Sequence, residues 1–181
     1  DSRPSAQAGA MLGRFVLRRM LGRGGQSAVW LAFDPRMERE VAIKVMRIDA
    51  TSDDKSISQW LQEARHAGKV AHPNIVQVFE ADVHGHQPYL VFEYVAGKTL
   101  DQLLQERGAL PAPEAVALMM DVLGAVAAAH AAGVVHRDLK PSNVVVDSAG
   151  HARVMDFGIA ARIQELPGAQ AYPAGAGTMG Y

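Results

Sequence analysis

The segment HRDLKPSN at residues 136–143, followed by DFG at residues 156–158, determines how this chain is interpreted. Five fixed positions within one octet are improbable by chance. The first segment brings a carboxylate, an amine and an amide together, and the second adds another carboxylate. Transfer of a phosphoryl group depends mainly on positioning and charge neutralisation, and these side chains supply both. The two segments therefore indicate phosphoryl-transfer chemistry.

Two motifs nearer the N-terminus bear on the same chemistry. GRGGQSAV at residues 22–29 lies between two predicted strands. Glycine lets a backbone approach phosphate oxygens closely, and the backbone amides then donate to them. VAIK at residues 41–44 places a lysine on the next predicted strand. Alone, the glycines fit a plain hairpin turn equally well, and a strand lysine is more often a solvated edge residue. The order of the two motifs favours a phosphate site.

Together the four motifs resemble those of the eukaryotic-type protein kinases. The resemblance implies that Asp138 orients the acceptor hydroxyl and that Lys140 offers a positive charge to the transferred phosphoryl group. It implies Asn143 and Asp156 as oxygen ligands of magnesium. The implied cofactors are ATP and Mg²⁺, and the implied partners are protein substrates with serine or threonine acceptors.

The resemblance also implies a nucleotide site. Lys44 is expected to contact the α- and β-phosphates and to be held by Glu63; a solvent-facing Glu63 is the alternative reading. Phe92 is expected at the back of an apolar adenine pocket. The implied nucleotide-contacting residues are Leu21, Gly22, Arg23, Gly24, Gly25, Gln26, Ser27, Ala28, Val29, Ala42, Lys44, Glu63, Glu93, Val95 and Val145. Ser27 stands where the family commonly has glycine, so we expect a modest change in nucleotide affinity.

The histidines do not indicate a metal site. The resemblance assigns His136 a packing role beside the ring of Phe157. Of the seven histidines, none forms a convincing ligand set, because His66 and His72 lack acidic companions at ligand spacing.

The order of the predicted elements favours an α+β, two-lobed fold. A disordered lead-in is expected at residues 1–13, an antiparallel sheet with one helix at 14–95, and a partial, mainly helical lobe at 96–181. Predicted strands cover residues 14–21, 28–33, 41–45, 75–82, 89–95, 144–146 and 152–155. Predicted helices cover about 56–69, 100–106 and a long segment from Pro111 to Gly133.

The composition is that of an ordinary globular protein, with 49% hydrophobic and 20% charged residues. A net charge of -1 gives no general attraction to nucleic acid, and none is expected as a partner. The absence of cysteine excludes disulfides and thiolate metal sites and fits a reducing compartment. Residues 115–135 are long and apolar enough for a transmembrane helix to be considered. Asp121 and His130 within them favour a buried core helix instead.

The implied substrate class is protein serine and threonine. Lys140 and Thr178 are typical of serine/threonine kinases, whereas tyrosine kinases usually carry Ala or Arg in the loop. A nucleotide-binding pseudokinase that acts as a scaffold is the main alternative, and the complete set of catalytic residues disfavours it. A small-molecule kinase is a weaker alternative, because such enzymes typically show an HGD-type loop that this chain lacks.

Two departures from the family lead to further expectations. The chain ends at Tyr181, where family members continue into more helices. We therefore expect residues 1–181 alone to have little activity and the helix after Pro111 to expose an apolar face. Between Gly158 and Gly177 there is no serine or threonine. We therefore predict that activity does not require phosphorylation of such a residue there, and that partner contact or dimerisation orders this segment.

The Ala-rich texture resembles bacterial members of the family, which often carry a membrane span and a sensor region outside the kinase domain. The resemblance therefore implies a cytoplasmic location for this domain. Contact with a membrane is expected only through regions outside this chain.

Overall fold

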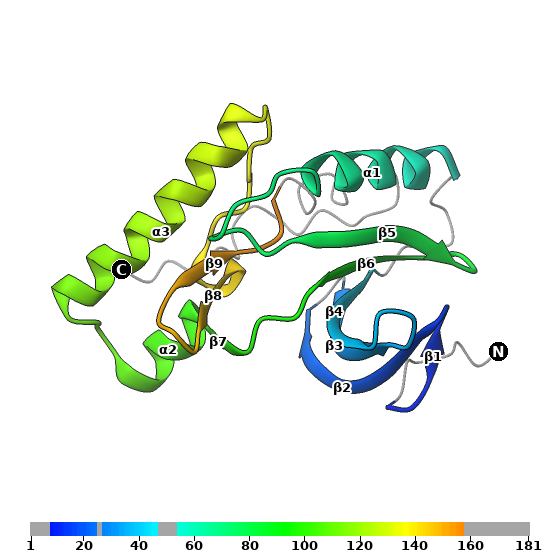
Figure 1. Ribbon diagram of the computed structural model, residues 1–181, viewed down its shortest axis with the longest axis horizontal. Coiled ribbons are helices and arrows are strands. Elements are labelled where there is room, and N and C mark those ends of the chain that lie inside the picture. Colours follow the sequence, from blue (N-terminus) through cyan, green and yellow to red (C-terminus); the bar gives the residue numbers. More distant parts are fainter. Residues whose placement is uncertain (1–7, 25–26, 47–53, 158–181) are drawn as a thin grey trace, which may run out of the picture.

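The computed structural model describes residues 8–24, 27–46 and 54–157, which form two antiparallel sheets and three α-helices (Figure 1). The large sheet has the strand order β1-β2-β3-β4-β6-β5, and the small one has the order β7-β8-β9. The strands of the large sheet are β1 (Met11–Leu12), β2 (Phe15–Arg23), β3 (Ser27–Asp34), β4 (Arg39–Met46), β5 (Val78–His84) and β6 (Gln87–Glu93). The other elements are α1 (Asp54–Ala67), β7 (Gly97–Thr99), α2 (Leu100–Arg107), α3 (Ala112–Ala131), a 3₁₀ turn η1 (Pro141–Asn143), β8 (Val144–Asp147) and β9 (Ala152–Val154). The predicted α+β fold class is confirmed.

Strand β4 shows how the sheet directs its side chains. Val41, Ile43 and Val45 are buried in one apolar cluster of the sheet. Successive side chains of a strand point to opposite faces, so Ala42 and Lys44 between them lie on the other face. The apolar alternation thus directs Lys44 away from that cluster.

Helix α1 lies along β5 (Figure 1). Ile57, Trp60, Leu61 and Ala64 are buried, and their spacing places them on one face of a helix. The predicted amphipathic helix is therefore confirmed, although it begins and ends somewhat earlier than expected.

Helices α2 and α3 follow the large sheet and are joined by an ion pair. Thr99 caps α2 in a reciprocal arrangement with Gln102, in which each side-chain oxygen accepts a hydrogen bond from the other residue's backbone N–H. At the other end, the guanidinium of Arg107 lies 2.7 Å from Glu114 of α3.

Helix α3 is long and apolar enough to cross a membrane, by length and composition alone. One of its faces packs against β9, and the carboxylate of Asp121 accepts a hydrogen bond from the backbone N–H of Ala152 at 2.9 Å. The buried residues are Leu118, Val122, Ala125 and Ala129, and the exposed apolar residues are Val116, Met119, Met120 and Leu123. The expected core helix is therefore buried on one face only, and an apolar face is exposed as predicted.

The small sheet contains the predicted β8–β9 hairpin and adds β7 to it. Gly97 pairs with Asp147 in this sheet. A side chain at Gly97 would collide with the backbone carbonyl of Val146. This close approach requires glycine and sets the path of the chain between the large sheet and α2.

Several predicted boundaries differ from the observed ones by a few residues, and two of the differences change how the chain is paired. The strand expected from residue 75 begins at Val78. Ile75 instead forms an isolated bridge with Val154 of β9, because the backbone before β5 bonds to the small sheet rather than the large one. In the expected disordered lead-in, residues 1–7 lie outside the described part of the chain, but Met11–Leu12 forms β1 and pairs with β2.

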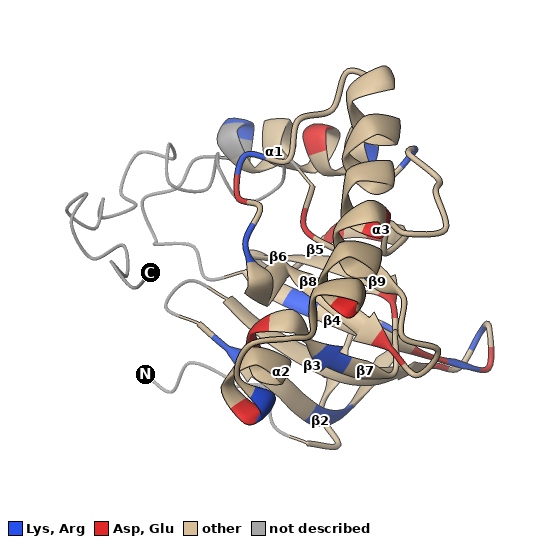
Figure 2. Cartoon of the chain, turned by 90° about the vertical axis from the view of Figure 1, so that its left-hand side faces the viewer, with Lys and Arg blue, Asp and Glu red and all other residues tan. Residues whose placement is uncertain are grey.

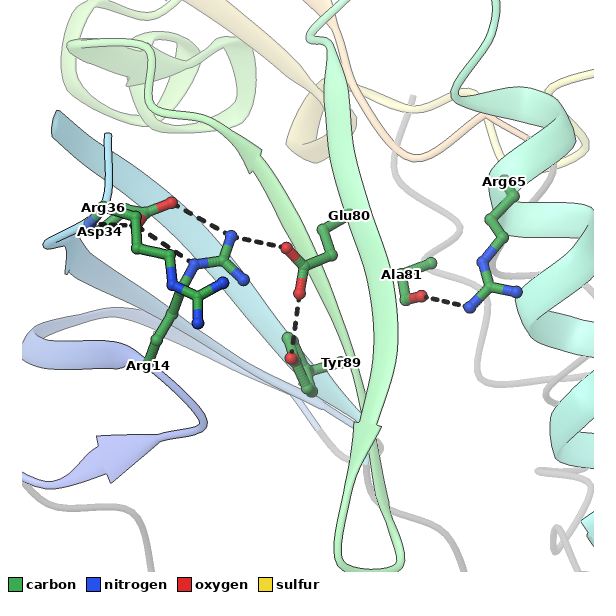
Figure 3. A network of polar contacts seen from close by, with 7 residues as sticks. All are labelled: Arg14, Asp34, Arg36, Arg65, Glu80, Ala81 and Tyr89. Carbon is green, nitrogen blue, oxygen red and sulfur yellow. Dashed lines mark hydrogen bonds and ion pairs between the residues drawn. The ribbon is translucent and has the colours of Figure 1, made fainter. Parts of the chain in front are cut away.

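A group of polar side chains, here called the Arg14 network, joins β3, β5 and β6 (Figure 3). The guanidinium of Arg14 lies 3.2 Å from Asp34 and 2.7 Å from Glu80, and the hydroxyl of Tyr89 donates to Glu80 at 3.2 Å. Burial alone would raise the pKa of Asp34, but hydrogen bonds from Arg14 and from the backbone of Arg36 outweigh it and hold that pKa below its ordinary value. Burial and the nearby Glu80 carboxylate raise the pKa of Tyr89 to about 12.

Candidate active site

The loop between α3 and β8 is held by the ring of His136. The Nε2 of His136 lies 2.8 Å from the carbonyl oxygen of Met155, and the backbone N–H of Asp138 donates to Nδ1 at 3.2 Å. An Nδ1 that accepts leaves the ring proton on Nε2, and burial lowers the pKa of His136. The ring also packs edge-on against Phe157, with centroids 4.7 Å apart. The structure thus places the expected packing pair together.

The carboxylate of Asp138 lies beside two other predicted site residues. Its Oδ2 is 2.8 Å from Nζ of Lys140 and accepts a hydrogen bond from Nδ2 of Asn143 at 3.1 Å. The same Nδ2 donates to the backbone carbonyl of Asp138 at 2.8 Å. The amide of Asn143 therefore fixes both the backbone and the side chain of Asp138.

Lys44 and Asp156 are 112 positions apart in the sequence and meet at 2.7 Å, from Nζ to Oδ2. Their side chains are 12% and 4% exposed. Asp156 has a φ of 65°, in the left-handed region that is sparsely populated by residues other than glycine. The turn after β9 thus aims this carboxylate toward β4.

The two halves of the site are bonded through the backbone. The N–H of Met155 donates to the carbonyl oxygen of Asn143 at 2.9 Å. Asp156 follows Met155 directly, so this bond ties the segment that carries Asp156 to Asn143. The five residues Lys44, Asp138, Lys140, Asn143 and Asp156 therefore form one site, which we call the active-site cluster.

The two predicted metal ligands fit a hard divalent cation. The Oδ1 of Asp156 is buried and has no hydrogen-bond partner among the described residues. Asn143 uses its Nδ2 for Asp138, so its amide oxygen faces elsewhere. Carboxylate and amide oxygens are the ligands that Mg²⁺ takes from proteins. A buried acceptor without a donor is costly, and a bound cation would satisfy it.

The glycine motif covers the end of β2 and the start of β3. The N–H of Gly24 donates to the carbonyl oxygen of Ser27 at 2.8 Å, while Gly25 and Gln26 lie outside the described residues. A side chain built at Gly22 would meet no atom of the described residues within 4 Å, so packing against that part of the chain does not explain the glycine. The open space fits close approach by a ligand. The other predicted loop positions lie on the facing ends of the two strands: Leu21, Arg23, Ala28 and Val29.

The predicted adenine-pocket residues are spread over both sheets. Ala42 pairs with Leu31 and with the buried Phe92 in the large sheet, and Val145 lies on β8 of the small sheet. Ala42, Val145 and Val95 are half-buried, so part of their apolar surface is uncovered. Their contact with a nucleotide stays a prediction.

Lys44 has an ion-pair partner that the sequence did not indicate. Glu63 lies half-buried on α1, where its Oε1 is 3.5 Å from Nε2 of Gln59. The ion pair that the structure gives Lys44 is with Asp156. The pair between Lys44 and Glu63 stays a prediction.

Sequence reasoning also missed Arg153. Its Nη2 lies 2.6 Å from Oε2 of Glu93, a residue predicted to bind the nucleotide through its backbone. The available signal was a long basic side chain within the otherwise apolar run at residues 152–155.

Comparisons with known proteins agree with this geometry. The family model described as protein kinase domain matches residues 15–181. Serine/threonine-protein kinase PrkC of Bacillus subtilis (strain 168) is 40% identical over 148 residues, which cover 82% of this chain and 23% of that protein. Probable serine/threonine-protein kinase PknB of Bifidobacterium longum (strain NCC 2705) is 36% identical over 173 residues, which cover 91% of this chain and 25% of that protein. The chain thus spans about a quarter of the length of these relatives.

A solved structure shows the same fold. The crystal structure of the Mycobacterium tuberculosis PknI kinase domain matches with a TM-score of 0.78 and 29% sequence identity, over 87% of this chain and 63% of that chain. Because the family model covers most of the sequence and the motif residues converge in space, this chain belongs to the protein kinase domain family.

Proposed function

We propose that this chain is the nucleotide-binding and catalytic part of a serine/threonine protein kinase. The reaction is transfer of the γ-phosphate of ATP, with Mg²⁺, to serine and threonine hydroxyls of protein substrates. The observation that carries the proposal is the active-site cluster, in which Lys44 meets Asp156 and Asp138 meets Lys140 and Asn143. The names of the bacterial relatives support the substrate class.

Asp138 has the geometry of a group that positions the acceptor. Its half-buried carboxylate is held by Asn143 and so presents a fixed acceptor for the hydrogen of an incoming hydroxyl. In a loose transition state the attacking hydroxyl loses its proton late, so a weak base suffices. Lys140 lies 2.8 Å from that carboxylate, where its charge can stabilise the phosphoryl group in transfer.

Lys44, Asn143 and Asp156 serve the nucleotide. Asn143 and Asp156 would hold magnesium, which supplies charge neutralisation at the phosphate oxygens when it is bound. Lys44 lies beside Asp156, so its ammonium group is already next to the place that the phosphates would occupy. Gly22 and Gly24 carry no side chain, which would let the phosphates approach the backbone there.

The decisive experiment measures phosphate transfer by the full-length gene product. Labelled ATP with magnesium should label serine or threonine in a general protein substrate, and Asp138→Asn should abolish most of the signal. Magnesium-dependent nucleotide binding without any transfer would favour the pseudokinase alternative. Residues 1–181 expressed alone are expected to show little activity.

The remaining proposals concern partners, regulation and location. In the cartoon of Figure 2, Lys and Arg positions are interspersed with Asp and Glu positions along the chain. The net charge of -1 gives no general attraction to nucleic acid, and we propose none as a partner. We infer a cytoplasmic location for this domain, with membrane contact only through other regions. Residues 158–177 lie outside the described part of the chain. We propose that partner contact or dimerisation, rather than phosphorylation of a serine or threonine there, controls activity. Treatment of the full-length protein with a phosphatase should therefore leave most of its activity intact.

A further inference from the structure

Arg153 on β9 links the small sheet to the end of β6 through Glu93. Its Nη2 lies 2.6 Å from Glu93 Oε2 and donates to the carbonyl oxygen of Ile75 at 3.3 Å. The side chains of Arg153 and Glu93 are 18% and 34% exposed. A hydrogen bond between two charged groups is stronger than one between neutral groups. One guanidinium therefore holds three segments that are distant in sequence.

Backbone bonds join the same three segments. The N–H of Val154 donates to the carbonyl of Asn74 at 2.7 Å, and the N–H of Val76 donates to Val154 at 2.8 Å. On the other side, the N–H of Glu93 donates to the carbonyl of Gln77 at 2.9 Å. β6 and β9 belong to different sheets, so the segment before β5 bridges them, and the Arg153–Glu93 pair spans the bridge directly.

Each residue of this ion pair is itself, or lies close in sequence to, a residue of the proposed nucleotide site. The backbone of Glu93 is predicted to bind the adenine edge. Two residues after Arg153 along the chain comes Met155, and then Asp156, whose carboxylate contacts Lys44. A nucleotide held at its base and at its phosphates binds tightly only if the two contacts already keep a fixed separation, because ordering them on binding lowers the affinity.

We propose that Arg153 is a positioning residue for the bound nucleotide. Through Glu93 it fixes the adenine-edge backbone relative to the metal ligand Asp156. This inference rests on the proposed kinase function and adds a residue to it. The pair borders a recess of about 390 Å³ lined also by Ala71, His72, Pro73, Ile75 and Gln77, so solvent reaches the contact, and salt should weaken it.

The test measures steady-state kinetics of the full-length gene product at saturating magnesium. Arg153→Met keeps most of the side-chain volume and removes the charge. It should raise KM for ATP about fivefold, the size expected for a partly exposed, charge-assisted contact. KM for the protein substrate should not change. Arg153→Lys, which keeps the charge, should restore KM for ATP to within about twofold of the wild type.

A purely structural role predicts a different pattern. Loss of folded protein would lower kcat without raising KM for ATP, and that result would overturn the proposal. An unchanged or lower KM for ATP in Arg153→Met would overturn it as well. Glu93→Gln provides a second variant in case Arg153→Met folds poorly, and it should raise KM for ATP in the same direction; an unchanged KM there counts against the proposal.

Two controls separate this inference from its premises. Arg18→Met breaks an exposed ion pair with Glu40 on the large sheet and should leave KM for ATP unchanged. If the double variant Arg153→Glu with Glu93→Arg recovers at least half of the lost affinity, the pair itself is responsible; no recovery would argue against it. A wild-type protein without transfer activity would refute the kinase function, whereas an active wild type with an unaffected Arg153→Met refutes only the role of Arg153.

Discussion

The Arg14 network and the active-site cluster are both groups of charged, partly buried side chains, yet they differ in whether each carboxylate oxygen has a hydrogen-bond donor. In the Arg14 network both carboxylates have donors on each of their oxygens, from Arg14, Tyr89 and backbone N–H groups. In the active-site cluster, Oδ1 of Asp156 has no donor among the described residues. A saturated network stabilises the fold, whereas an unsaturated one leaves acceptors for a ligand.

The largest expected effect separates activity from stability. Asp138→Asn in the full-length protein should lower kcat by about 10² or more, because it removes a preorganised charge at the reacting hydroxyl. The free energy of unfolding should hardly change, since Asp138 is only half-buried. Steady-state kinetics and denaturant unfolding measure the two quantities. Asp101→Asn on α2 is the matched control and should change neither; a comparable loss of kcat there would undermine the assignment.

The second effect should fall on stability alone. Arg14→Met leaves the buried carboxylate of Asp34 without its main partner and should lower the free energy of unfolding by about 2 kcal/mol. The folded protein should keep its kcat and KM. Arg18→Met, which breaks an exposed pair, should cost less than about 1 kcal/mol. Equal losses in the two variants would show that the Arg14 network is no stronger than a surface ion pair.

A third, smaller effect tests the unsatisfied oxygen. Asp156→Asn should weaken nucleotide binding about tenfold in the presence of magnesium, because it removes a charged ligand. Without magnesium the affinity should change much less. Titration with a fluorescent nucleotide, with and without the metal, measures this difference. An equal loss under both conditions would mean that Asp156 does not act through a metal.

The smallest effect concerns pH and lies in the Arg14 network. The pKa of Tyr89 is raised from 10.0 to about 12, so the folded state holds this proton more tightly than the unfolded state. The free energy of unfolding should therefore fall as pH rises from about 10 to about 12. Tyr89→Phe should remove that part of the slope and cost about 1 kcal/mol at neutral pH for the lost hydrogen bond. Denaturant unfolding of both proteins between pH 8 and pH 12 checks this. If the free energy of unfolding changes with pH equally in the wild type and in Tyr89→Phe, the prediction is wrong.

Local patterns predicted the elements that depend on local causes. The apolar spacing of α1 and the turn of the β8–β9 hairpin lie within single short segments, and both are present. The wrong start of β5 has a distant cause, because Ile75 is bonded to β9 far along the chain. The exposure of an apolar face on α3 was expected, but the sequence did not show which face would pack, since α3 is apolar on more than one face.

The site divides in the same way. The family resemblance named Lys44, Asp138, Asn143 and Asp156, and the structure brings them together. The family resemblance did not indicate that Asp156 is the ion-pair partner of Lys44, because the two residues are separated by 112 positions. The Arg14 network has the same character: Arg14 and Glu80 are 66 positions apart. Pairs of this kind depend on how the sheets close, which no local pattern encodes.

The backbone of the active-site loops has a consequence for evolution of the protein. Arg137 and Asp156 hold φ values of 66° and 65°, in a region that costs residues with a Cβ on the order of 1 kcal/mol each. Glycine would relieve that cost but remove the side chain. Selection for heat resistance alone should therefore enrich glycine at these two positions, and selection for turnover should drive it out again at position 156.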